Sequence, residues 1–187
     1  MGRYTGPKEK LSRREGVELH LKGARSFSDK SGLKRKPFAP GQHGNQRRAR
    51  LSNYGFQLRE KQKVKRTYGL REKNMVAAYK ESDRRSKIKN TDKGLEFLRL
   101  LELRMDNVLY LAGLAPSRAA ARQYITHGHV KLNGHKNSVP SIEIREGDSI
   151  ELKKAKLAPN EKLFKTPDWI ETKDSSCKVV RLPIRDD

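Results

Sequence analysis

The sequence predicts an α+β protein, with a mostly helical, basic N-terminal domain that has extended loops and a small inserted α+β module of two helices on a small twisted β-sheet. The net charge of +21 lies almost wholly in residues 1–93, which hold 27 Lys+Arg and 9 Asp+Glu, against 16 and 13 in residues 94–187. Apolar residues recur at helical spacing in the middle of the chain and alternate as in strands further on. We therefore expect a basic domain at 1–102, the module at 103–163, and a tail at 164–187 that packs back on the body.

Residues 1–52 are rich in turn-forming and basic residues and show no sustained period. One short helix is expected there, with Ser12 as its N-cap, Glu15 completing a capping box and Gly23 ending it. The rest of this segment is expected to be basic loop. Disorder of the segment in the isolated protein is the alternative, because few apolar residues are present to offset so much like charge.

Residues 53–68 are expected to form a helix that Ser52 opens and Gly69 ends. Its apolar residues leave only a thin stripe, while cations occupy most sides of the cylinder. Such a helix is a poor core element and suits a position against phosphates. A solvated surface helix is the alternative interpretation.

Two further helices are expected, one over 71–86 and one after a cap at Asp92. The first carries Glu81 and Arg85 at the spacing of an i,i+4 ion pair. The second has the strongest amphipathic pattern in the chain, through Leu95, Leu98, Leu101 and Met105. We expect this apolar stripe to face the core.

The module is expected to begin with helices over 107–112 and 118–126. The dipeptide Asn133-Gly134 then predicts a hairpin turn, and further strands are expected at 142–144 and 149–152. In the tail, an isolated tryptophan is expected to anchor the tail on the core rather than to bind a ligand.

Five candidate binding residues gather at one helix–strand junction of this module. Ser117 stands where an N-cap belongs, and Arg118 and Arg122 lie one turn apart on the same face of the helix. His127 falls in the following turn, and Lys131 on the outward face of the next strand. A helix N-terminus and two guanidinium groups suit phosphate. With so high a net charge and so few aromatic residues, the expected partner is structured RNA.

Other classes of site find little support in the sequence. His127 and His129 could bind a metal, but no third or fourth ligand is apparent, so we expect no metal and no cofactor. The single cysteine, Cys177, allows no disulfide framework and has no evident activating base nearby. Neither a phosphate-cradling Gly loop, nor a nucleophile elbow, nor an apolar run of about 20 residues occurs. We therefore expect a soluble, intracellular, non-catalytic protein with no small-molecule substrate and no membrane contact.

Four motifs carry a resemblance to a known family. They are RYTGPKEKLSRREG (3–16), APGQHG (39–44), YGFQLREKQKVKRTYG (54–69) and RMDNVLYLAGLAPSRAAARQYITHGHVKLNG (104–134). Together they closely resemble bacterial small-subunit ribosomal protein four, over about residues 1–172. The stretch 104–163 resembles the RNA-binding module named after that protein, which is also found in some pseudouridine synthases and aminoacyl-tRNA synthetases.

The resemblance implies a structural protein of a bacterial-type small ribosomal subunit, in the cytoplasm or in an organelle. The family binds 16S ribosomal RNA directly and early, at a multi-helix junction of the 5′ domain, and nucleates assembly of the subunit. It lines the messenger RNA entry channel beside ribosomal proteins three and five, and its contact with protein five influences decoding accuracy. Some members repress their own operon.

Charge and resemblance together single out the residues expected to bind RNA. The basic stretch expected at the messenger RNA entry channel is Arg47, Arg48 and Arg50. The expected rRNA-binding residues are Arg3, Tyr4, Lys8, Lys10, Arg13, Arg14, Lys22, Arg59, Lys61, Lys63, Lys65, Arg66, Tyr68, Arg71, Ser117, Arg118, Arg122, His127 and Lys131.

The sequence departs from the family pattern in two places. Many relatives hold zinc with cysteines in the N-terminal region, whereas residues 1–52 contain no cysteine, so a zinc-free variant is expected. The chain also ends sooner after Pro167–Trp169 than typical members do, so a short tail is expected.

Two other classes of protein carry the same module and stand as alternatives. An RNA-modifying enzyme would need a catalytic domain with an acidic nucleophile, for which the basic first half is poorly suited. A ribosome-associated rescue or heat-shock factor would not need an N-terminal region that resembles ribosomal protein four. The resemblance over residues 3–69 therefore disfavours this class.

Overall fold

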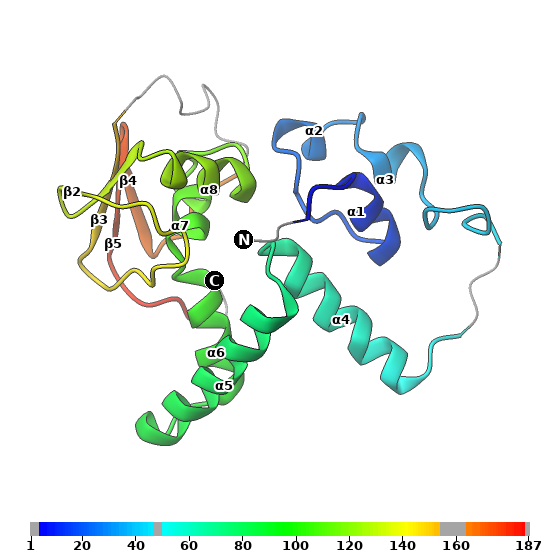
Figure 1. Ribbon diagram of the computed structural model, residues 1–187, viewed down its shortest axis with the longest axis horizontal. Coiled ribbons are helices and arrows are strands. Elements are labelled where there is room, and N and C mark those ends of the chain that lie inside the picture. Colours follow the sequence, from blue (N-terminus) through cyan, green and yellow to red (C-terminus); the bar gives the residue numbers. More distant parts are fainter. Residues whose placement is uncertain (1–3, 47–49, 154–163, 186–187) are drawn as a thin grey trace. The chain divides into compact units, whose positions relative to one another are not determined.

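The computed structural model of the chain describes residues 4–46, 50–153 and 164–185. It divides into two compact units, Met1–Glu72 and Lys73–Asp187. In the first, the described residues form helices and loops, whereas the second combines helices with a five-stranded antiparallel sheet (Figure 1). The α+β class expected from the sequence is confirmed.

Small residues stand at several helix ends of the first unit. They are α1 (Glu9–Glu15), α2 (Ala24–Phe27), α3 (Gly32–Arg35) and α4 (Asn53–Thr67). Gly16 ends α1 in the left-handed conformation, with φ 73°, which a residue without Cβ adopts at little cost. The hydroxyls of Ser31 and Ser52 accept hydrogen bonds from the N–H groups of Leu33 and Gly55, and so cap α3 and α4. The expected cap at Ser52 is thereby confirmed.

Ser12 does not cap a helix, so this expectation was wrong. It lies buried inside α1, which starts earlier, at Glu9. Its hydroxyl donates to Glu18 Oε1 over 3.2 Å and accepts from the N–H of Leu19 over 3.4 Å. The helix also ends well before Gly23, which instead precedes α2. The Ser12 hydroxyl therefore bonds to Glu18 and Leu19, which follow the helix in the chain, and does not cap a helix N-terminus.

The interior of the first unit is largely polar. Among its described residues, Leu19 and Tyr68 are the only buried hydrophobic residues. Ser12 and Ser31 are buried as well, and both hydroxyls donate to the carboxylate of Glu18. Few apolar side chains of this unit are therefore fully removed from solvent, and hydrogen-bonded polar groups occupy part of its interior.

Four further helices follow along the chain. They are α5 (Glu72–Lys89), α6 (Lys93–Glu102), α7 (Met105–Leu111) and α8 (Arg118–Thr126). The two compact units divide at the start of α5, earlier in the chain than the change expected at residue 102. Asp92 caps α6 by accepting from the Leu95 N–H over 2.9 Å, as expected. None of the helices in the described ranges is long and apolar enough to cross a membrane.

The apolar stripe of α6 is only partly in the core. Leu101 is 1% exposed, but Leu98 is 40% exposed, which corrects the expectation for that residue.

On α5 the expected ion pair is present, with 2.8 Å between Arg85 Nε and Glu81 Oε1. Hydrogen bonds from Arg84 and Arg85 lower the pKa of Glu81 to about 2. Arg85 Nη2 also donates to Glu143 Oε2 over 2.7 Å, which joins α5 to the segment before the third strand.

The sheet of the second unit has the strand order β2-β1-β3-β5-β4. Its strands are β1 (Val130–Leu132), β2 (His135–Lys136), β3 (Ser149–Leu152), β4 (Ile170–Lys173) and β5 (Ser176–Val179). Leu132 pairs with His135 across the turn at Asn133-Gly134, which confirms the expected hairpin. Alternate residues of the strands are buried in one cluster with α7 and α8: Val130, Ile150, Leu152, Ile170, Cys177 and Val179.

One strand expectation differs from the structure, and two strands of the sheet were not expected. Residues 142–144 form no strand of the sheet, because they pair with the connection between α6 and α7: the Ile144 N–H donates to Leu103 O, and the Met105 N–H donates to Ile142 O, each over 2.8 Å. Conversely, β4 and β5 were missed. The turn between them contains Asp174 at φ 45° and no glycine, so it lacks the usual hairpin signal.

Cys177 lies on the inner face of β5 and is a reporter for the folding of the second unit. Burial raises the pKa of its thiol to about 12. We expect no reaction with a thiol reagent at pH 8 in the native protein, and full reaction in denaturant, because the thiolate is the reactive species. The measurement is the labelled fraction by mass spectrometry. Rapid labelling under native conditions would contradict this burial.

Candidate nucleic-acid interface

The N-terminus of α8 carries three of the expected binding residues. The Ser117 hydroxyl accepts from the Ala120 N–H over 3.2 Å, which confirms the expected cap. Arg118 and Arg122 follow on the helix, and both side chains are half-buried. One helix end thus presents a capped turn and two guanidinium groups, an arrangement that suits a phosphate group.

Both arginines are held by the preceding helix, α7. Arg122 donates from Nε and Nη2 to Asp106 Oδ2, over 3.0 and 2.6 Å. Arg118 donates from Nε to Asn107 Oδ1 over 2.7 Å, and its guanidinium lies 4.5 Å from the ring centre of Tyr110. Burial raises the pKa of Tyr110, and the positive charge of Arg118 opposes that rise. The arginines therefore have defined orientations without any partner molecule.

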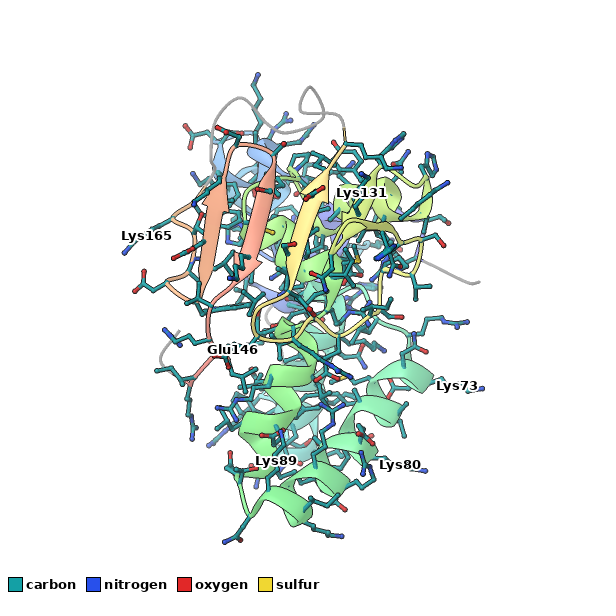
Figure 2. The ribbon with its side chains drawn as sticks, turned by 90° about the vertical axis from the view of Figure 1, so that its left-hand side faces the viewer. Lys73, Lys80, Lys89, Lys131, Glu146 and Lys165 are labelled. Carbon is teal, nitrogen blue, oxygen red and sulfur yellow. The ribbon has the colours of Figure 1, made fainter. Side chains whose placement is uncertain are left out.

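His127 and Lys131 follow α8 directly. His127 is the exposed C-cap residue of α8. Lys131, labelled in Figure 2, is the middle residue of β1. Its partners in the neighbouring strands are Lys136 and Glu151. The ring centres of His127 and His129 are 6.2 Å apart. Within the described ranges no three His, Cys, Asp or Glu residues are grouped so that they could hold a metal ion.

The cations of α4 are engaged within the first unit. Arg59 and Arg66 both bind Glu15, with 3.4 Å between Arg59 Nη1 and Glu15 Oε1. Lys61 and Lys65 bind Glu72, and their hydrogen bonds lower the pKa of that carboxyl. Contacts with Glu72 are exposed and could be exchanged for phosphates, whereas those with the buried carboxylate of Glu15 bind α4 to α1.

Other expected rRNA-binding residues also have structural contacts. Lys63 binds Glu60 over 2.6 Å. Arg13 donates to the carbonyl groups of Lys36 and Phe38 over 3.1 and 3.0 Å, and so holds the loop after α3. Tyr68 is buried. Arg13 and Tyr68 therefore contribute to the fold whatever they bind, whereas the exposed Lys63–Glu60 pair contributes little.

The remaining expected residues divide by exposure. Exposed on the surface are Tyr4, Lys10, Arg14, Lys22, Arg50 and Arg71. Lys8 is half-buried. Three expected residues, Arg3, Arg47 and Arg48, lie outside the described residues.

The sequence analysis did not predict a role for Asp106 and Asn107. These two residues accept the hydrogen bonds that hold Arg122 and Arg118. Both lie in the RMDN motif at the start of α7, and both are buried. A carboxylate and an amide inside an otherwise apolar run were the available signal, because such groups need partners when buried.

Comparison with known proteins gives matches over most of the chain. Residues 3–102 match the family described as "Ribosomal protein S4/S9 N-terminal domain", and residues 103–150 match the "S4 domain". The small ribosomal subunit protein uS4 of Geobacter sulfurreducens is 47% identical over 197 residues, which cover 100% of this chain and 92% of that protein. The chain belongs to the uS4 family.

Other uS4 proteins give the same result. Those of Natranaerobius thermophilus and Heliobacterium modesticaldum are 42% and 46% identical, again over 100% of this chain and 92% of each relative. The resemblance seen in the sequence motifs is thereby confirmed. The uS4 family consists of ribosomal structural proteins and not of enzymes, and its S4 domain contains the junction of α7, α8 and β1 described above.

Proposed function

We propose that this chain is a structural protein of a bacterial small ribosomal subunit, located on the cytoplasmic ribosome, and that it binds 16S rRNA directly. The observation that carries this proposal is the identity of 47% over the whole chain to a protein named for that subunit. The net charge of +21 supports an RNA partner, because such a charge repels itself unless a polyanion compensates it.

In this proposal the RNA contacts come from both parts of the chain. The basic domain at 1–102 and the module at 103–163 bind a multi-helix junction of the 5′ domain early in assembly. The stretch Arg47, Arg48 and Arg50 lies at the messenger RNA entry channel, beside ribosomal proteins three and five, and influences accuracy there. Arg50 is exposed, which suits this role.

The mechanism is charge neutralisation over a large surface. Each cation that meets a phosphate releases condensed counterions, so affinity falls as salt rises. The helix N-terminus of α8 and the guanidinium groups of Arg118 and Arg122 recognise phosphate geometry rather than base identity. Specificity then comes from the shape of the folded RNA.

Chemical footprinting of full-length 16S rRNA with the purified protein alone tests this function. We expect protection clustered at one junction of the 5′ domain that persists at physiological salt. Diffuse protection that disappears by about 0.2 M salt would indicate generic binding of a basic protein, and the proposed assembly role would be withdrawn.

Single substitutions of the two arginines test the module face. Arg118→Gln is expected to weaken binding to the 5′-domain RNA and to reduce the slope of log affinity against log salt by about 1, because one phosphate contact is lost. Glutamine is the appropriate replacement at Arg122, since a glutamate there would place a second carboxylate beside Asp106. Unchanged affinity in both variants would remove this face from the interface.

A further inference from the structure

Two buried polar residues of α7 lie beside the two arginines of α8. Asp106 is 2% exposed and Asn107 is 1% exposed. Burying a carboxylate or an amide is unfavourable unless hydrogen-bonding partners replace the lost water. The hydrogen-bonding partners of Asp106 and Asn107 therefore indicate the role of these two residues.

Asp106 is held between two guanidinium groups. Arg104 donates from Nε to Oδ1 and from Nη2 to Oδ2, over 3.1 and 2.9 Å, and Arg122 donates from Nε and Nη2 to Oδ2. The Arg104 side chain is 13% exposed and that of Arg122 is 29% exposed. Arg104, the less exposed arginine, thus neutralises the buried carboxylate of Asp106. The three side chains together carry one net positive charge, and Arg122 is the more exposed of the two arginines.

Asn107 orients the second arginine in the same way. Its Nδ2 donates to the carbonyl and to Oε2 of Glu102, over 2.8 and 2.6 Å. These two bonds determine which way the amide faces, so Oδ1 is directed to Nε of Arg118. The Tyr110 ring beneath the guanidinium then restrains its plane.

We propose that Asp106 and Asn107 are positioning residues of the RNA-binding face, which orient the guanidinium groups of Arg122 and Arg118 before RNA arrives. A long side chain that is already ordered loses less conformational freedom on binding. The inference rests on the proposed function, because it assumes that this face binds RNA. Asp106 and Asn107 act through the arginines and need not touch RNA.

The substitution Asp106→Asn separates positioning from simple charge. It removes a negative charge, so charge neutralisation alone predicts tighter RNA binding. Positioning predicts the opposite: an asparagine amide has one acceptor oxygen and no charge, so the charge-assisted hydrogen bonds that hold Arg122 become weaker and its orientation becomes less defined. A matched control is Glu171→Gln, which makes the same charge change at an exposed site on β4, the edge strand farthest from β1 and β2 in the sheet order.

Affinity of the full-length variants for a transcript of the 16S rRNA 5′ domain is the measurement. We expect Asp106→Asn to bind about tenfold more weakly and Glu171→Gln to bind as tightly as the unchanged protein or more tightly. In the Arg122→Gln background, Asp106→Asn should add no further loss, because it acts through Arg122. Tighter or unchanged binding by Asp106→Asn, or additive losses, would overturn the positioning role. Failure of the unchanged protein to bind would instead overturn the proposed function.

The free protein provides a second measurement that does not depend on the folding of a variant. The Nε–Hε groups of Arg118 and Arg122 should show slow hydrogen exchange and restricted motion by NMR in the absence of RNA. Arg145, an exposed arginine of the same unit, is the internal reference. Equal mobility of all three side chains would overturn the inference, even if Asp106→Asn did not fold.

Discussion

Replacing Glu15 with alanine is expected to unfold the first unit by removing about 3–5 kcal/mol from its free energy of unfolding. The carboxylate side chain is 0% exposed and binds Arg59 and Arg66, which joins α1 to α4. Its loss would leave two guanidinium groups without the buried charge that they share. With Leu19 and Tyr68 as the only buried hydrophobic residues among the described part of this unit, little apolar burial remains to offset that loss.

Hydrogen exchange of the α4 backbone amides in the full-length protein measures this effect. Glu60→Ala is the matched control: it removes a carboxylate from an exposed pair with Lys63 and should change stability by less than about 1 kcal/mol. Equal protection of α4 in the two variants would show that the Glu15 pairs contribute nothing to the fold.

Trp169→Ala is expected to have an effect of similar size on the second unit, about 3–5 kcal/mol. Trp169 is 2% exposed and belongs to the same buried cluster as the inner residues of β1, β3 and β5. Its carbonyl accepts from the Val180 N–H over 3.0 Å, just beyond the β4–β5 pair. Truncation would leave a cavity where the C-terminal segment meets the core.

Urea unfolding followed by circular dichroism and by labelling of Cys177 measures this loss, since the protein has one tryptophan and the variant therefore has no tryptophan fluorescence. Val139→Ala truncates an apolar side chain that is 48% exposed and serves as the control. A stability loss no larger than that of the control would mean that the C-terminal segment is an appendage rather than part of the core.

Features with local causes could be read from the sequence. The caps at Ser52, Asp92 and Ser117 and the hairpin at Asn133-Gly134 are confirmed, because each depends on hydrogen bonds or backbone conformations within a few residues. Ser12 was misread for the complementary reason: its neighbours in sequence form a capping pattern, but its hydroxyl meets Glu18 in the folded unit.

The candidate site shows the same division. The sequence places Ser117, Arg118 and Arg122 on one helix end, because helical spacing alone determines that face. It does not show that Asp106 and Asn107 hold the two arginines, since those contacts cross from α7 to α8.

By itself, the sequence determined the α+β class, the basic first half, the family and the position of most helices. The class, the charge distribution and the helices follow from composition and short-range periodicity, which do not depend on contacts distant in the chain, and the family follows from the resemblance of four sequence motifs. Only the tertiary structure decided that Arg59 and Arg66 bind a buried carboxylate, that residues 142–144 leave the sheet, and that β4 and β5 complete it. Each of these features depends on a partner distant in the chain. A buried ion pair or a pair of strands stabilises the protein only after folding has brought both partners together.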